Sequence, residues 1–142
     1  MAEQPNAAQR FRDAVDHRDV AAMIETMAED VELHSPTMLP PVKGRDRVHR
    51  VFLVLAELFE DFEYVRTFDG ALVSPEPDIV SSHALMFRSH IGDEMLEGVD
   101  VLDIDRSDHI ARFTVLIRPM SGLQTLAESI RQRMTQRAPA SG

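Results

Sequence analysis

Hydrophobic positions follow two different periods along the chain, and the change of period predicts where helices give way to strands. In residues 5–17, and again after Asp19, apolar side chains recur at three- and four-residue steps, which is typical of amphipathic helices. Asp19 is placed to cap the second of these helices. Residues 31–35 alternate like a strand, and residues 36–44 hold three prolines and a glycine, which predicts a loop.

The strongest helical pattern covers residues 45–60, and after it the period falls to two. Strands joined by short turns are predicted at residues 62–68, 79–91, 95–104 and 110–118. Gly92-Asp93 is a two-residue hairpin turn in which glycine supplies the positive φ. A closing helix is predicted over residues 122–134, before a frayed tail of residues 135–142. Helices segregated from hairpin-linked strands indicate an α+β fold, in a single domain of residues 1–142.

Composition narrows the class of protein. A chain of 142 residues with 44% apolar side chains can build one core. The absence of cysteine excludes disulfides, thiolate ligands and thiol nucleophiles. The net charge of −9 opposes binding to nucleic acid. The sequence shows no bilayer-spanning apolar run and no export signal, so we expect a cytoplasmic protein with no membrane partner. The six scattered histidines lack metal-binding spacing, so we expect neither a metal nor a cofactor.

Four segments carry a resemblance to a known family. Residues 97–105 (EGVDVLDID) and 110–119 (IARFTVLIRP), with residues 28–36 and Lys43-Gly44-Arg45, resemble SnoaL-like proteins of the nuclear transport factor 2-like superfamily. The resemblance covers residues 8–120. It implies a cone-shaped α+β barrel, in which a curved antiparallel sheet wraps around the N-terminal helices and one long helix. It also implies a homodimer formed through the outer face of the sheet. It specifies no function, because the superfamily includes isomerases, cyclases, dehydratases, hydrolases and non-catalytic binding domains.

Asp100 is the most informative position for chemistry. Strand alternation places it on the same face as Leu102 and Ile104, so an acid lies within an apolar stripe. Burial raises the pKa of a carboxyl group, and the neutral acid can then donate a hydrogen bond to a developing oxyanion. The resemblance places Asp100 where ketosteroid isomerases, which share the superfamily, keep their oxyanion-hole aspartate. The alternative is an aspartate held by a nearby arginine or histidine for structural reasons.

The remaining catalytic positions of those isomerases are not matched. The isomerases carry a tyrosine on the first helix and an aspartate base after the first strand, where this chain has Phe11 and Ser35. Standard ketosteroid isomerase activity is therefore not expected. His34 and His83 are the candidate proton partners for Asp100. Alternation places His34 on the face opposite Ser35, and the alternative for both histidines is a structural hydrogen bond.

A set of mostly apolar side chains is predicted to line a cavity, and the same set would also serve as ordinary packing: Phe11, Ser35, Phe52, Met86, Phe87, Phe113, Val115 and Ile117. The leading hypothesis is a protein that binds a small apolar, oxygen-bearing molecule. If it is an enzyme, it is a cofactor-independent isomerase, cyclase or dehydratase in which Asp100 stabilises negative charge or acts as the acid and base. The alternatives are a non-catalytic ligand-binding or regulatory dimer, and an interaction module whose cavity its own side chains fill.

Overall fold

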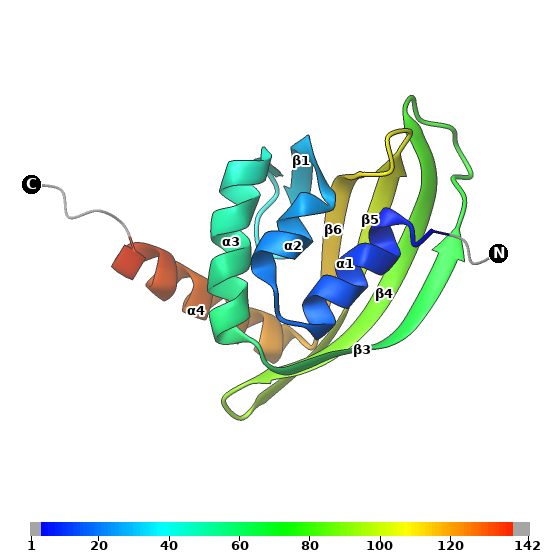
Figure 1. Cartoon of the computed structure of the whole chain (residues 1–142). Coiled ribbons are helices and arrows are strands. Elements are labelled where there is room, and N and C mark those ends of the chain that lie inside the picture. The colour runs from blue at the N-terminus through cyan, green and yellow to red at the C-terminus, as the bar shows by residue number, and fades with distance from the viewer. Residues whose placement is uncertain (1–3, 138–142) are drawn as a thin grey trace, which may run out of the picture.

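The computed structural model describes residues 4–137, in which helices cover one face of a curved six-stranded sheet (Figure 1). In chain order the elements are α1 (Ala7–Asp16), α2 (Val20–Glu25), β1 (Met27–His34), β2 (Val42–Lys43), α3 (Arg45–Leu58), β3 (Glu60–Gly70), β4 (Ile79–Ile91), β5 (Glu94–Asp105), β6 (Ile110–Arg118) and α4 (Met120–Arg137). The strand order is β2-β1-β6-β5-β4-β3. Because β2 and β3 remain edges, the sheet is open and does not close into a barrel. The predicted α+β class is confirmed.

Local sequence accounts for most element boundaries. Asp19 caps α2 by accepting a hydrogen bond from the Ala22 backbone N–H at 3.0 Å, as predicted. Strands β4 and β6 begin and end at the predicted residues. The turn between β4 and β5 has Gly92 at φ 58°, a conformation that glycine adopts at little cost. The capping residue and the turn glycine therefore determine where these elements begin and end.

Several boundaries differ from the prediction. Helix α3 ends at Leu58 and β3 covers Glu60–Gly70, where the sequence predicted a helix to residue 60 and a strand over residues 62–68. Strand β1 begins at Met27, where the sequence predicted a strand only from residue 31. The proline-rich loop contains the short strand β2, which pairs with β1. Helix α4 runs to Arg137, so residues 135–137, predicted as part of a frayed tail, are helical, while residues 138–142 lie outside the described residues. The early start of β1 arises because its first residue, Met27, pairs with the distant Ile110 of β6, and such pairing overrides local propensity.

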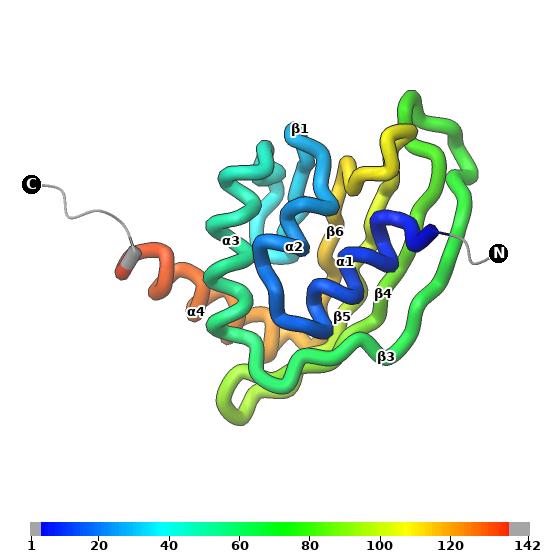
Figure 2. Tube along the Cα trace, viewed as in Figure 1, coloured from blue at the N-terminus to red at the C-terminus, as the bar shows by residue number. Residues whose placement is uncertain are grey.

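Strand β1 joins the sheet by parallel pairing with β6, in contrast to the antiparallel pairs that link β3, β4, β5 and β6. Its register places His34 opposite Thr114. The C-terminal end of β1, and Ser35 after it, consequently lie beside the second half of β6. The tube drawing shows β1 next to β6, with α2 in front of β1 (Figure 2).

Three phenylalanine rings join the helices to the sheet. Phe11 of α1, Phe52 of α3 and Phe113 of β6 contact one another edge to face, with ring centroids 5.1 to 6.0 Å apart. Each such contact contributes about 0.5–1.5 kcal/mol beyond burial. On β5, Gly98 leaves room for the Phe87 ring, because a Cβ there would come within 2.6 Å of that ring and 2.3 Å of the Leu116 carbonyl oxygen. These contacts set the shape of the space between helices and sheet.

Within residues 4–137, every helix is too short or too polar to cross a bilayer.

Candidate functional site

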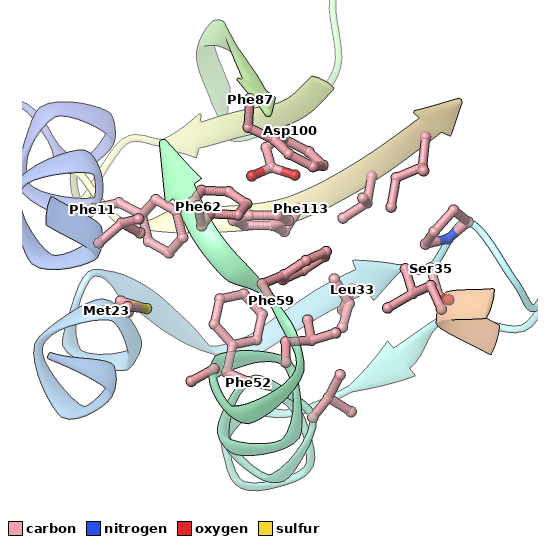
Figure 3. A pocket seen from close by; sticks show the side chains of 18 of the residues that line it. Phe11, Met23, Leu33, Ser35, Phe52, Phe59, Phe62, Phe87, Asp100 and Phe113 are labelled. Carbon is pink, nitrogen blue, oxygen red and sulfur yellow. The ribbon is translucent and has the colours of Figure 1, made fainter. Parts of the chain in front are cut away.

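A cavity of about 260 Å³ lies between the helices and the inner face of the sheet (Figure 3). All four helices and strands β1, β3, β4, β5 and β6 contribute to its walls. Of the side chains that the sequence predicted to line a cavity, all but Met86 do so: Phe11, Ser35, Phe52, Phe87, Phe113, Val115 and Ile117. The walls are mostly aromatic and aliphatic, so the space suits an apolar molecule.

Asp100 is the carboxyl group on the wall of this cavity. It lies on β5 between Leu85 of β4 and Val115 of β6, and it is 5% exposed. Its Oδ2 accepts a hydrogen bond of 2.5 Å from the Tyr64 hydroxyl. Among the described residues, Oδ1 has no hydrogen-bond partner. Oδ1 also keeps some accessible surface, because Arg45 Nε is the one fully buried side-chain nitrogen or oxygen of these residues that lacks a partner. Oδ1 is therefore open to the cavity.

The surroundings of Asp100 change its acidity. Burial raises the pKa of Asp100 from 3.8 to about 7, and the hydrogen bond from Tyr64 opposes the rise. Burial, and then the charge and hydrogen bond of Asp100, raise the pKa of Tyr64 well above its usual 10. At neutral pH the phenol therefore keeps its proton, while Asp100 populates both its neutral and its ionised form. A carboxyl group poised near pH 7 is suited to proton transfer.

Tyr64 is the site residue that sequence reasoning missed. It is the one tyrosine in the chain, and it lies on β3, two residues after Phe62, whose ring stacks on Phe87 at 4.8 Å between centroids. The sequence did hold a signal for Tyr64, because it lies in a segment with strand alternation. A buried tyrosine hydroxyl usually needs a hydrogen-bond partner, so a polar partner inside the fold was to be expected. Tyr64 brings a phenol to the cavity that Phe11, at the position matched to the isomerase tyrosine, does not carry.

Neither predicted proton partner reaches Asp100. His34 lies on the side of β1 opposite Leu33, as alternation indicated, and its Nε2 is 3.2 Å from the Glu32 carboxylate. His83 shares a strand face with Leu85, but both its ring nitrogens are engaged elsewhere, by Asp69 and Ser81. The two histidines are absent from the cavity lining, so the assignment of either as the partner of Asp100 has no geometric support.

Two residues predicted to line the cavity, Met86 and Ser35, do not offer a free polar group to it. Met86 faces away from the cavity, because it lies between Leu85 and Phe87 on β4 and successive side chains alternate; its sulfur is 4.0 Å from Arg66 Nη1. Ser35 does line the cavity, but its Oγ is 2.9 Å from Thr37 Oγ1 and accepts the Thr37 backbone N–H at 3.1 Å. The Ser35 hydroxyl is therefore part of a local turn.

Few ionisable groups meet the cavity. Among the described residues that line it, Asp100, Tyr64 and the exposed Arg18 are the ones with ionisable side chains. Within residues 4–137, no three histidine, aspartate or glutamate side chains form a group that could hold a metal ion. The chemistry that this lining can supply is hydrogen-bond donation and proton transfer by Asp100 and Tyr64.

Comparison with known proteins agrees with this architecture. A family model described as the SnoaL-like domain matches residues 8–113. A steroid delta-isomerase from Pseudomonas aeruginosa superposes with a TM-score of 0.78 at 29% identity, over 96% of each chain. An uncharacterized protein with a cystatin-like fold from Silicibacter pomeroyi gives a TM-score of 0.79 at 25% identity, over 92% of this chain and 86% of that one. A Mycobacterium tuberculosis protein in complex with estradiol-17beta-hemisuccinate shares the fold, with a TM-score of 0.61 at 20% identity over 82% and 93% of the two chains. No curated protein matches the sequence.

Proposed function

The chain belongs to the SnoaL-like domain family, and on that premise we propose that its cavity binds a small, largely apolar molecule through one carbonyl or hydroxyl oxygen that meets Asp100. The observation that carries the proposal is that the two carboxyl oxygens of Asp100 have different surroundings. Tyr64 donates to Oδ2, so the proton of the neutral acid is carried by Oδ1, which is open to the cavity. A ligand oxygen in the cavity can accept that proton in a hydrogen bond.

The volume of the cavity limits the size of the ligand. Pockets for drug-sized molecules hold about 300–1,000 Å³, whereas this one holds about 260 Å³. A molecule of one or two rings fits that space better than a four-ring steroid. The aromatic walls formed by Phe62, Phe87 and Phe113 favour a flat ring system.

The chemistry that we propose is proton transfer without a cofactor, of the isomerase, cyclase or dehydratase type. Asp100 Oδ1–H would give its proton to a carbonyl oxygen while a proton on the adjacent carbon leaves to water, which yields the enol. Donors placed at a developing oxyanion contribute about 2.7–4 kcal/mol each. The 29% identity to a steroid delta-isomerase supports this class of reaction. The matched base position is Ser35, so Asp100 serves as the acid and, after it loses its proton, as the base.

A non-catalytic ligand-binding role is the second candidate, and one observation favours it. Apart from Asp100, the described residues that line the cavity include no carboxylate and no histidine to remove a proton from carbon. In either role we propose a homodimer through the outer face of the sheet, where Leu116 is 58% exposed. The cytoplasmic location stays a prediction from the sequence.

A matched pair of ligands and variants tests the proposal. The ketone 1-tetralone should raise the thermal midpoint of the protein more than tetralin, which has the same rings without the oxygen, because bound ligand stabilises the folded state. Asp100→Asn keeps a donor and should keep much of this preference, whereas Asp100→Ala removes the donor and should reduce it. Equal stabilisation by both compounds would refute contact with the ligand oxygen.

Proton exchange separates the two candidate roles. If Asp100 transfers protons, 1-tetralone in D₂O should gain deuterium next to its carbonyl at a rate that Asp100→Asn lowers by about 10²–10³-fold. Tetralone that binds in the cavity without exchange would identify a non-catalytic carrier.

A further inference from the structure

A chain of three side chains outside the cavity has the connectivity of a serine nucleophile with its base. His83 Nδ1 lies 2.7 Å from Asp69 Oδ1, and His83 Nε2 lies 3.1 Å from Ser81 Oγ. Ser81 and His83 are two residues apart on β4, so they share one face of the strand. Asp69, on the neighbouring strand β3, is paired with His83. None of the three lines the cavity. The group is thus separate from the Asp100 site.

The hydrogen bonds determine the role of each atom. An ionised carboxylate only accepts hydrogen bonds, so Asp69 requires the proton of the imidazole to be on Nδ1. Nε2 is then an acceptor, and the Ser81 hydroxyl donates to it. In this arrangement a base can take the proton of the serine while a third group holds the tautomer and orientation of the ring.

Burial fixes the ring and leaves the serine accessible. The His83 side chain is 8% exposed, whereas that of Asp69 is 83% exposed. Ser81 is half-buried. Along β4 the last residue paired with β3 is Ser82, opposite Gly70, so Ser81 lies just beyond the end of the neighbouring strand. The imidazole is therefore held in place at a point where the sheet is open on one side.

We infer that Ser81, activated by His83 and Asp69, is a nucleophile for carboxylic esters. His83 Nε2 accepts the Ser81 proton as Oγ bonds to the acyl carbon. The carbon–oxygen bond to the alcohol then breaks, and the alcohol leaves with that proton. Water attacks the acyl-serine and gives a proton to His83, the carboxylic acid departs, and the proton returns to Ser81. Asp69 remains ionised throughout.

Covalent labelling tests the nucleophile directly. Diisopropyl fluorophosphate, which transfers its phosphoryl group to an activated serine and releases fluoride, should modify the full chain at Ser81, located by mass spectrometry. His83→Gln should lower the labelling rate by about 10²-fold, the contribution of a general base. Ser82→Ala, a neighbour on the opposite strand face, should label as the unmodified chain does. Absence of a modification at Ser81, or equal labelling after His83→Gln, would overturn the inference.

A cysteine exchange covers the case in which His83→Gln does not fold. The chain contains no cysteine, so Ser81→Cys and Ser82→Cys each introduce a single thiol. Iodoacetamide should alkylate the thiol at residue 81 faster than the one at residue 82, because an adjacent imidazole increases the thiolate fraction. Asp69 is exposed, so Asp69→Asn can be added to Ser81→Cys. The double variant should be alkylated at residue 81 more slowly than Ser81→Cys alone. If Asp69→Asn leaves the alkylation rate at residue 81 unchanged, Asp69 and His83 do not activate this position.

Discussion

The buried carboxyl group of Asp100 makes a quantitative prediction for folding stability. Its pKa in the folded chain is about 7, against 3.8 in the absence of burial. Because the folded pKa is raised, the folded chain binds the proton more tightly between pH 4 and pH 7 than the unfolded chain does. The contribution of Asp100 to stability is therefore fully present below pH 4 and is lost as the pH rises to 7.

The size of this loss follows from the two pKa values. A difference of one pH unit corresponds to about 1.4 kcal/mol, so a difference of about three units gives about 4 kcal/mol, to the order of magnitude. Domains of this size have unfolding free energies of about 5–15 kcal/mol. Asp100→Asn places a neutral group of the same shape at the site, and the variant should not show this loss.

The assay is urea unfolding of the wild type and Asp100→Asn at several pH values from 4 to 8. The free energy of unfolding of the wild type, minus that of the variant, should fall by about 4 kcal/mol across this range. Subtracting the variant removes the contribution of the other ionisable groups. Asp93→Asn, in the exposed turn between β4 and β5, is the control and should give a flat difference. A difference for Asp100→Asn that is also flat would refute the claim that this carboxyl is buried in an apolar site.

Four further variants test separate parts of the account. Tyr64→Phe removes the donor to Asp100 Oδ2, so the stability loss should move to higher pH, by about one to two units for a hydrogen bond to a charged group; an unchanged profile in urea unfolding would contradict the pairing. Gly98→Ala should cost about 1–3 kcal/mol by overpacking, whereas Gly70→Ala, with 3.6 Å to the nearest atom, should cost less; equal costs would argue against the close approach at β5. Phe113→Ala should cost about 3–5 kcal/mol, and a cost below about 1 kcal/mol would show that the three rings are not packed as described. Leu116→Arg should halve the sedimenting mass if the outer face of the sheet forms a dimer of the 16.0 kDa chain; a wild type that sediments at the mass of one chain would refute the dimer.

Local sequence was sufficient for much of the fold because its signals are short-range. The hairpin at Gly92 and the strands on either side depend on a turn residue and on period-two alternation, and both occur at the predicted positions. The start of β1 at Met27 and its parallel pairing with β6 depend on contacts between segments about 80 residues apart. Alternation within one strand does not encode which distant strand lies beside it.

In the candidate site, too, the sequence predicted the features that depend on one strand or helix and missed those that depend on contacts between strands. Alternation along β5 placed Asp100 on the inner face, and the apolar faces of the helices placed Phe11 and Phe52 opposite it. The hydrogen bond from Tyr64 joins β3 to β5 across β4, and the sequence carries no signal for that pairing. For His83, alternation gave the face but not the partners, because Asp69 comes from the neighbouring strand.

The protonation state of Asp100 can be measured residue by residue. With ¹³C-labelled aspartate in the folded chain, the carboxyl carbon signal that disappears in Asp100→Asn should titrate with a midpoint near pH 7. A midpoint near 4, the usual range for a solvated aspartate, would contradict the central claim that a neutral carboxyl group faces the cavity.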